Sequence, residues 1–530
     1  MNIQQILQHL RDEFEIICEI DCNFINRVDL IQQINAAHRE SYSQNQRIII
    51  YYSRSHKHLL SDIQLALNVI DISNPFVCVI TTDNNVLTKY NTIQNLDQNT
   101  INFYVASGNF ELIDANSPPL TKVDILEILS SLTDLSDDEK YLLHNSKHFC
   151  LAPWIHSYID TKGDVTLCCA NTTVHGSTKS NTIKEIFYSD HVNNIKNQML
   201  NDEFINGCNR CYDEEKLGRT SYRNAFNQKY SKHINQTQSN EFKLVSWDFR
   251  FNNLCNLACR SCGPDASTSW FKPAKSIGIN ITQNMHSIND NVFKQLLEHV
   301  DVVEEIYFAG GEPLIIKEHY KLLDILLKEQ HNDVRLIYNT NLTETTYKGI
   351  DVFDLWNQFN SVSVCASLDA EGKRAEYLRC GTVWNNIVNN RKRMKEKCPN
   401  VYFWISATTG LINALHVPDF HRSWVEKDLI NNAGDFNIQN IYNPEYMRVD
   451  RATPELKKKI IEKYNNHIKW LIDKDKTRRA ISGFQSIIDY LENLKEFDKN
   501  LFWENIQPLD EYYNLWLLDV FPELDILPKT

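Results

Sequence analysis

The sequence has little glycine and proline, no surplus of positive charge and no long apolar run. Only 15 of its 530 residues are glycine and 14 are proline, so long disordered stretches are not expected. The formal net charge of −13 argues against a large nucleic-acid interface, because such an interface needs a basic face. The sequence has no run of about 18 apolar residues, so no transmembrane helix is expected. The N-terminus lacks the apolar core of a signal peptide, and we therefore expect a cytoplasmic protein.

The length implies several domains, because a single hydrophobic core stops growing well below 530 residues. We predict four parts, which differ in composition and in the pattern of apolar residues. They are an N-terminal α/β domain (residues 1–140), a cysteine-rich module (145–235), an array of strands and helices (240–445) and a helical C-terminal extension (446–530).

Residues 1–140 carry apolar patterns but no phosphate-binding loop and no other motif. The patterns predict helices over residues 3–14 and 56–70, and strands over residues 47–52, 75–81 and 101–106. This order favours a parallel sheet. A scaffolding or partner-docking role is the simpler interpretation of this domain, and substrate recognition is the alternative.

Residues 240–445 alternate six β-rich segments with helical patterns. The predicted strands are residues 244–249, 305–308, 334–338, 361–366, 401–407 and 435–438, and the helices include residues 291–299, 317–328 and 384–397. Six such steps predict an α/β fold with a parallel sheet, open or curled into a partial (β/α)6 barrel. In such folds the catalytic and binding residues lie at the carboxyl ends of the strands. After the array, Thr453 is predicted to cap a helix that begins at Pro454.

Three cysteines follow the first strand of this array. In a long chain without a signal peptide, 14 cysteines indicate metal ligation and buried thiols rather than disulfides. Cys255, Cys259 and Cys262 have the spacing C-x3-C-x2-C. Three thiolates in one loop can bind three irons of a 4Fe–4S cluster and leave the fourth iron open to a small molecule. A zinc site or a chance spacing is the alternative, although no fourth cysteine or histidine follows closely.

This spacing resembles the signature of the radical S-adenosylmethionine superfamily. A second family element, G-G-E-P, occurs at residues 310–313, about 48 residues after the third cysteine and directly after the second predicted strand. The resemblance implies that Gly310 and Gly311 let the backbone approach the methionine moiety of the cofactor and that Glu312 accepts from its ammonium group. The sequence departs from the family at Ser261, where an aromatic residue often packs on the adenine.

Three more segments resemble elements of the same superfamily. Asn341 lies in a segment similar to T-N-G, although Leu342 replaces the glycine. Ser367 and Asp369 lie in a segment similar to S-x-D, and Arg379 lies in one similar to Y-x-R-x-G. The resemblance implies that these side chains help to bind S-adenosylmethionine. Structural roles are the alternative, with Asp369 as a helix cap and Arg379 in a surface ion pair.

A second set of cysteines precedes the array. Cys150, Cys168, Cys208 and Cys211, with Cys169 as an alternative to Cys168, supply enough thiolates for a fully ligated cluster. The same spacing suits a tetrahedral zinc site equally well.

The surrounding motifs C-x2-P-W, G-x-V-x-x-C-C and C-x2-C-Y resemble the auxiliary-cluster module called twitch, a shortened relative of the SPASM module. In one subgroup of the superfamily this module precedes the radical domain, as it does here. The segments of residues 259–270 and 519–524 also resemble that subgroup. The resemblance covers about residues 145–440 and the tail, but not residues 1–140.

The resemblance implies two iron–sulfur clusters, both of the 4Fe–4S type, together with S-adenosylmethionine and an electron donor such as flavodoxin or ferredoxin. It implies reductive cleavage of S-adenosylmethionine to a 5′-deoxyadenosyl radical, which abstracts hydrogen from a substrate. A peptide or protein is the favoured substrate. The alternatives are a small molecule, such as a sugar, amino acid or nucleotide, and a non-catalytic zinc-binding interaction protein. Cys380 could donate hydrogen near the cofactor, although a buried thiol is its simpler interpretation.

Overall fold

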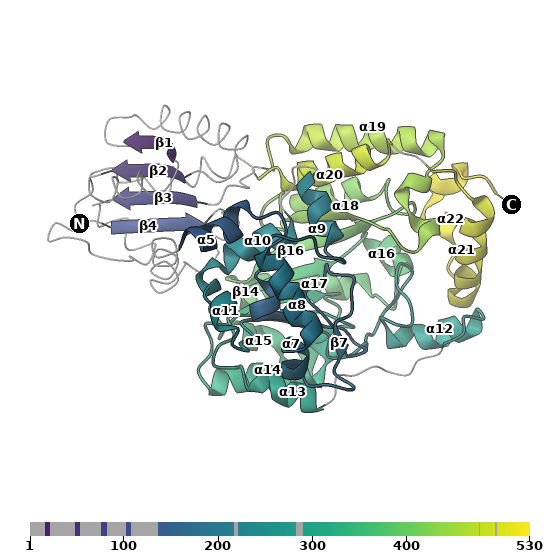
Figure 1. Cartoon of the computed structure of the whole chain (residues 1–530). Helices are drawn as coiled ribbons and strands as arrows, with labels where there is room; N and C mark the ends of the chain where they lie inside the picture. Colours follow the sequence, from purple (N-terminus) through teal and green to yellow (C-terminus); the bar gives the residue numbers. More distant parts are fainter. Residues whose placement is uncertain are drawn as a thin grey trace. The chain divides into compact units, whose positions relative to one another are not determined.

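The computed structural model describes residues 16–21, 48–53, 76–81, 102–107, 136–216, 221–281, 290–475, 477–492 and 495–529 (Figure 1). The chain forms two compact units, of which the first contains residues Met1–Tyr158 and Val165–Val245. The second contains Ile159–Asp164 and Ser246–Thr530. The finer division into four domains stays a prediction. Within the described residues, every helix is too short or too polar to cross a lipid bilayer.

The first unit begins with a four-stranded sheet in the order β1-β2-β3-β4. Its strands are β1 (Ile16–Asp21), β2 (Ile48–Ser53), β3 (Phe76–Thr81) and β4 (Asn102–Ser107). The predicted parallel pairing is correct for β2 with β3, but β4 runs antiparallel to β3. The additional strand β1 pairs with β2 in parallel. An antiparallel edge strand on an otherwise parallel sheet is a common arrangement. The sequence did not predict β1, and the predicted helices over residues 3–14 and 56–70 lie outside the described residues.

The cysteine-rich part of the first unit has short strands and several helices. They are β5 (His156–Ile159), β6 (Asp164–Thr166), β7 (Gly176–Ser177), α6 (Ala152–Ile155), α7 (Ile183–Phe187), α8 (Asp190–Leu200), α9 (Asn209–Lys216) and α10 (Tyr222–Lys229). Phe149, Trp154, Met199 and Phe226 belong to its hydrophobic core.

The helical pattern of residues 182–200 predicts a single helix between the two cysteine groups. This prediction is wrong, because the chain forms two helices there. Thr182 closes a capping box with Glu185 at the start of α7. Ser189 then caps α8, and its hydroxyl accepts from the backbone N–H of Val192 at 3.3 Å. Ser189 thus begins a second helix, although the apolar pattern continues from α7 into α8 without interruption.

The second unit contains a parallel sheet with the strand order β17-β16-β14-β11-β10-β8, and each neighbouring pair is parallel. The strands are β8 (Ser246–Phe249), β10 (Glu305–Phe308), β11 (Arg335–Thr340), β14 (Val362–Ser367), β16 (Tyr402–Thr409) and β17 (Phe436–Asn440). All six predicted strands of the array are therefore present, and the α/β class is confirmed. The predicted helices correspond to α13 (Asp290–Leu297), α14 (Lys317–Lys328) and α17 (Trp384–Lys397).

The two faces of this sheet differ in polarity. On one face, the ring of Phe308 lies 4.9 Å from that of His319 on α14, and Phe403 stacks on Trp424 of α18 (Val417–Glu426). The opposite face carries partly exposed polar side chains, for example Ser367 beside its register partner Ser406. Period-two alternation along each strand produces this difference.

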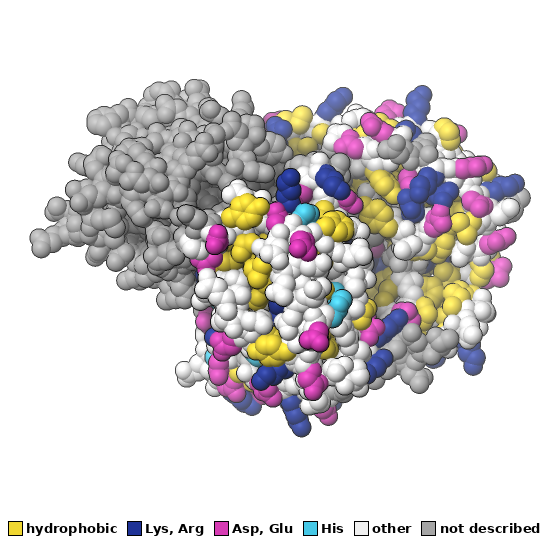
Figure 2. Space-filling view, in the orientation of Figure 1, with side chains coloured by type: hydrophobic (Ala, Val, Ile, Leu, Met, Phe, Trp, Pro, Cys, Tyr) yellow, Lys and Arg dark blue, Asp and Glu magenta, His cyan; other side chains and the backbone are white. Residues whose placement is uncertain are grey.

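Helices follow the sheet, as predicted for residues 446–530. They are α19 (Pro454–Leu471), α20 (Arg479–Tyr490), α21 (Lys499–Tyr513) and α22 (Leu517–Val520). The predicted cap is confirmed, since the Thr453 hydroxyl accepts from the backbone N–H of Leu456 at 3.3 Å. On the face shown in Figure 2, basic and acidic side chains are interspersed rather than gathered by sign.

Candidate functional site

The three cysteines of the first set lie in one loop after β8, where their thiols interact. Cys259 is buried in the short strand β9 (Ala258–Cys259), which pairs antiparallel with β15 (Arg379–Cys380). Burial raises the pKa of the Cys255 thiol to about 11, and the nearby Cys262 thiol adds to this rise. Burial also raises the pKa of Cys259, and both other thiols contribute. The neighbouring thiols thus oppose ionisation of Cys255 and Cys259 within the same loop.

The segment that follows the cysteines holds this loop in place. The Ser267 hydroxyl donates to the carbonyl of Leu257 at 2.6 Å, and the Ser269 hydroxyl donates to that of Cys255 at 2.7 Å. The indole N–H of Trp270 donates to the carbonyl of Cys259 at 2.9 Å. The polar and aromatic residues after the third cysteine therefore fix the backbone from which the thiols project.

The two glycines of G-G-E-P lie against the same loop. The backbone N–H of Gly311 donates to the carbonyl of Asn252 at 3.1 Å, and a Cβ at Gly311 would lie 2.1 Å from the carbonyl oxygen of Leu254. Gly310 has a φ of +123°, which side chains rarely adopt. The close approach of the backbone to the cysteine loop thus explains why glycine occupies both positions.

Glu312 is buried at the end of β10, with only 1% of its surface exposed. Its carboxylate accepts from the Thr340 hydroxyl and the Asn341 backbone N–H, each at 2.7 Å, and from the Leu314 N–H at 3.0 Å. Burial raises its pKa to about 7, although these hydrogen bonds and the positive charge of Arg379 oppose the rise. A buried carboxylate held in this way can accept a hydrogen bond from an ammonium group.

Asn341 follows β11 and reaches the first cysteine. Its side-chain amide lies 3.9 Å from the Cys255 sulfur and donates to the Asn256 side-chain oxygen at 2.9 Å. The next residue, Leu342, stands where the related motif has glycine, and it adopts the left-handed φ of +57° that glycine favours. The backbone conformation of the motif is therefore kept without its glycine.

Asp369, which is buried, and Arg379, which is partly buried, form an ion pair beside the second cysteine. The guanidinium Nε lies 2.8 Å from the Asp369 carboxylate, and Nη1 lies 3.8 Å from the Cys259 sulfur. Asp369 also accepts from the backbone N–H of Thr408 at 2.9 Å. The alternative roles do not fit: Glu371 rather than Asp369 occupies the N-cap of α16 (Gly372–Leu378), and only 12% of the Arg379 side chain is exposed.

The structure thus brings Glu312, Asn341, Asp369 and Arg379 around the three thiols, while Ser367 lies at the end of β14 opposite Ser406. Among the described residues, no group of three or more His, Cys, Asp or Glu side chains is arranged to hold a single metal ion. An iron–sulfur cluster distributes its thiolates over several irons, and soft thiolates are the ligands that such clusters use. Three thiols beside a guanidinium, of which Cys259 is buried and Cys255 and Cys262 are partly buried, fit such a cluster by their donor chemistry.

The second set of cysteines comes together in the first unit. The thiols of Cys208 and Cys211 contribute to the raised pKa of Cys150, which burial sets at about 12. Cys168 interacts with Cys150 and Cys211 and is buried, whereas the neighbouring Cys169 is exposed. Burial and interaction favour Cys168 over Cys169 as a ligand.

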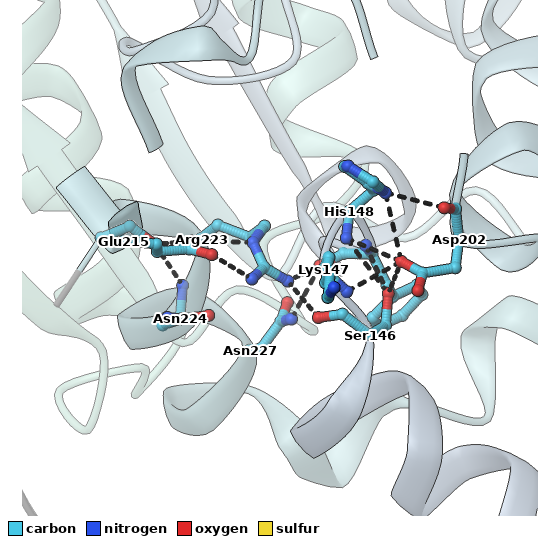
Figure 3. A network of polar contacts seen from close by, with 10 residues as sticks. Ser146, Lys147, His148, Asp202, Glu215, Arg223, Asn224 and Asn227 are labelled. Carbon is cyan, nitrogen blue, oxygen red and sulfur yellow. Dashed lines mark hydrogen bonds and ion pairs between the residues drawn. The ribbon is translucent and has the colours of Figure 1, made fainter. Parts of the chain in front are cut away.

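Arg223 on α10 holds the backbone around Cys150 (Figure 3). Its guanidinium donates to the carbonyls of Phe149 at 2.8 Å and Ser146 at 3.1 Å, and it pairs with Glu215 at 2.6 Å. Its positive charge lowers the pKa of Cys150, Cys208 and Cys211, against the larger effect of burial. Sequence reasoning missed Arg223, because it lies outside the cysteine motifs and no spacing marks it.

Two further residues, Asn227 and Asp202, form hydrogen bonds with the segment around Cys150. The Asn227 side chain donates to the Phe149 carbonyl at 3.0 Å and accepts from the Leu151 N–H at 2.8 Å, so the peptide groups on both sides of Cys150 are fixed. Figure 3 also shows Asp202 beside residues 146–148, which precede Cys150 in the chain. Asp202 accepts there from the backbone N–H groups of Lys147 and His148, each at 2.8 Å.

Cys380 and the other described cysteines outside the two sets are buried. The Cys380 thiol donates to the carbonyl of Tyr377 at 3.3 Å and lies in a core cluster with Trp270 and Leu509. Cys365 and Cys398 are buried as well. The hydrogen-donor role of Cys380 stays a prediction.

Comparison with known proteins identifies the second set. Residues 150–212 match the family model described as SPASM, an iron-sulfur cluster-binding domain. This segment is therefore a SPASM domain, and the predicted auxiliary iron–sulfur module is confirmed. Among curated proteins, no significant sequence match is found.

Several solved structures resemble parts of the chain. One is anSMEcpe with bound AdoMet and the Cp18Cys peptide, at 18% identity over 44% of this chain and 60% of that one, with a TM-score of 0.30. SuiB of Streptococcus suis bound to precursor peptide SuiA is 14% identical over 49% of this chain and 58% of that one, with a TM-score of 0.32. TYW1 with a lysine-pyruvate adduct is 15% identical over 43% and 71% of the two chains, with a TM-score of 0.24. The chain spans less than two thirds of the length of the first two structures.

Proposed function

We propose that the chain is a radical S-adenosylmethionine enzyme with a partial (β/α)6 barrel, whose cleavage cluster is bound by Cys255, Cys259 and Cys262. The observation that carries the proposal is the convergence of polar groups on the cysteine loop. Asn341 reaches the Cys255 sulfur and Arg379 reaches that of Cys259, from elements far apart in the sequence. A zinc-binding interaction protein would not need a buried carboxylate and a partly buried ion pair at such a loop.

The chain's own residues would act by binding and positioning. Bound to a 4Fe–4S cluster and S-adenosylmethionine, the site would supply reductive cleavage of the cofactor to a 5′-deoxyadenosyl radical. Glu312 would accept from the cofactor's ammonium group, while Asn341, Ser367 and Asp369 would orient its polar groups. Gly310 and Gly311 would allow the close backbone approach. Arg379 would stabilise negative charge on the thiolate of Cys259.

The SPASM domain would hold a second 4Fe–4S cluster through Cys150, Cys168, Cys208 and Cys211. Its short form, placed before the radical domain, is that of the twitch subgroup. Arg223 would offset part of the negative charge of the four thiolates, because it is buried beside them. The domain would assist the oxidation of a substrate, bind the substrate or stabilise the fold.

A peptide or protein in a modification pathway is the proposed substrate, and an electron donor such as flavodoxin or ferredoxin is the proposed partner. The SPASM match identifies the auxiliary module. The resemblance to the radical S-adenosylmethionine superfamily supports this choice, because relatives with such modules often act on peptides. Radical oxidation or rearrangement of a small molecule is the second candidate. A short precursor-peptide gene beside this one would favour the first, and sugar- or nucleotide-handling genes would favour the second.

Metal analysis and electron paramagnetic resonance test the proposal. After anaerobic purification, we expect about eight irons per chain, as two 4Fe–4S clusters require. We also expect that S-adenosylmethionine changes the spectrum of the dithionite-reduced protein. Cys255→Ala should abolish that change, whereas the matched variant Cys398→Ala, at a buried thiol outside both sets, should keep it. Zinc without iron in carefully reconstituted protein would refute the proposal.

A further inference from the structure

A chain of hydrogen bonds runs from the surface of the SPASM domain to the sulfur of Cys208. The side-chain amide of Asn171 donates to this sulfur at 3.4 Å. The Asn171 side-chain oxygen lies 3.0 Å from Nε2 of His175, and Nδ1 of His175 lies 2.9 Å from Nε2 of His191. Asn171 is buried and His191 is exposed.

The backbone settles which way the Asn171 amide points. The backbone N–H of Thr173 donates to the Asn171 side-chain oxygen at 3.1 Å. Because a backbone N–H can only donate, the atom facing it must be the oxygen, and the NH₂ group must face Cys208. The contact between Asn171 and the thiol is therefore an N–H donor aimed at sulfur.

The same reasoning fixes the two histidines. The Asn171 oxygen can only accept, so Nε2 of His175 carries the proton and donates to it. In the neutral ring Nδ1 then accepts, and Nε2–H of His191 donates to it. Burial and the neighbouring His191 lower the pKa of His175 to about 4, so its ring stays neutral at physiological pH. Every donor in the chain thus points toward Cys208.

The residue before Cys208 leaves room for this arrangement. Gly207 has a φ of +88°, and a Cβ there would lie 2.3 Å from the Thr173 hydroxyl and 3.1 Å from the Asn171 side-chain nitrogen. The carbonyl of Gly207 accepts from the backbone N–H of Thr172 at 3.1 Å. The loop of residues 171–173 is thereby held against the start of the C-x2-C motif.

The other thiols of the second set have a different environment. Backbone N–H groups of Ala152, Ala170 and Arg223 lower the pKa of Cys150, Cys168 and Cys211, respectively. Cys208 instead interacts with side chains, the amide of Asn171 and the hydroxyl of Tyr212. Hydrogen bonds to cluster sulfurs stabilise the more negative, reduced state and so raise the reduction potential.

We propose that Asn171 is a positioning residue that raises the reduction potential of the second cluster by donating to the sulfur of Cys208. This inference rests on the proposed function, in which Cys208 binds that cluster. His175 and His191 strengthen the donor, since aligned hydrogen bonds polarise one another. Asn171 would thereby favour the reduced form of a cluster bound through Cys208.

A potentiometric titration of the full chain tests this proposal. In the triple variant Cys255→Ala, Cys259→Ala, Cys262→Ala, the proposed function leaves only the second cluster, to which dithionite supplies one electron. Asn171→Asp keeps the oxygen that Thr173 and His175 contact but replaces the N–H donor with an acceptor. Asn194→Asp makes the same change of charge at an exposed position of α8.

We expect Asn171→Asp to lower the ratio of reduced to oxidised cluster about tenfold at a fixed potential, a shift of about 59 mV for one electron. Asn194→Asp should change the ratio much less. Equal midpoint potentials for the two variants would overturn the inference while leaving the proposed function intact. If the triple variant itself contained no iron, the chain would bind no second cluster. That result would overturn both this part of the proposed function and the inference.

Asn171→Asp could lose the second cluster altogether, so a second measurement uses protein in which Asn171 is kept. With ¹⁵N-labelled asparagine, electron–nuclear double resonance of the reduced second cluster should detect a coupled side-chain ¹⁵N and a proton that exchanges in D₂O. A spectrum without a coupled ¹⁵N would overturn the inference.

Discussion

The guanidinium of Arg260 and the carboxylate of Asp510 form an ion pair of 2.8 Å in the interior of the second unit. Arg260 directly follows Cys259, whereas Asp510 belongs to the C-terminal helix α21. The guanidinium also lies over the ring of Tyr377 at 3.7 Å, and the Tyr377 hydroxyl donates to Asp510 at 2.8 Å. The C-terminal extension, which carries no metal-binding motif, is therefore part of the support of the cysteine loop.

Asp510→Asn should destabilise the protein strongly, because it leaves the buried charge of Arg260 without its counter-ion. Breaking a buried pair typically costs about 3–5 kcal/mol. Urea unfolding measures the loss. The control is Asp525→Asn, which breaks an exposed pair with Lys529 and should cost less than about 1 kcal/mol. Equal effects of the two variants would contradict the described role of Asp510.

Gly311→Ala should displace the cysteine loop, because the new methyl group would meet the Leu254 carbonyl at 2.1 Å. We expect the iron content to fall by about half, from two clusters to one. Gly263→Ala is the matched control, since a Cβ at Gly263 meets nothing within 4 Å. If both variants retain the same iron content, close approach is not the reason for glycine at position 311.

Cys168→Ser should remove the second cluster, whereas Cys169→Ser should keep it, because only Cys168 is buried among the other thiols. Iron analysis should give about four irons for the first variant and about eight for the second. The reverse result would make Cys169 the ligand.

Acid should destabilise the protein through two buried histidines. Nδ1 of His421 lies 3.0 Å from Nε2 of His467, and burial lowers their pKa values to about 3 and about 2. Below the ordinary histidine pKa of about 6.5 the unfolded chain binds protons that these rings do not, so stability falls as pH falls from about 6.5 to 3. Each ring contributes at most about 1.4 kcal/mol per pH unit.

His467→Gln should reduce that pH dependence by about one proton, as measured by urea unfolding at pH 7 and pH 5. His331→Gln, at a position outside the core, is the control and should leave it nearly unchanged. An unchanged slope in His467→Gln would contradict a neutral, buried His467.

The strands of the array and the two cysteine sets could be predicted because their signals are local. β-rich segments between helical patterns fixed all six strands within a few residues, and cysteine spacing needs no knowledge of the fold. The direction of β4 and the break between α7 and α8 could not be predicted in the same way. The first depends on pairing across the sheet, and the second depends on a single capping serine within a continuous apolar pattern.

The residues that support the thiols could not be predicted from the sequence, for a different reason. Arg223, Asn171 and Asp510 lie far along the chain from the cysteines that they support, and an isolated Arg, Asn or Asp has no distinctive spacing. The glycines of G-G-E-P were interpreted through a cofactor, whereas the backbone of the cysteine loop already requires them.

Cleavage of S-adenosylmethionine at the loop of Cys255, Cys259 and Cys262 is the activity that we propose. Its most direct test is chromatography for 5′-deoxyadenosine after anaerobic reduction of the reconstituted protein with S-adenosylmethionine. We expect 5′-deoxyadenosine to form with the unmodified chain and with Cys169→Ser, and we expect Cys255→Ala to abolish it. No 5′-deoxyadenosine from iron-loaded protein, or an equal amount from Cys255→Ala, would contradict the proposal.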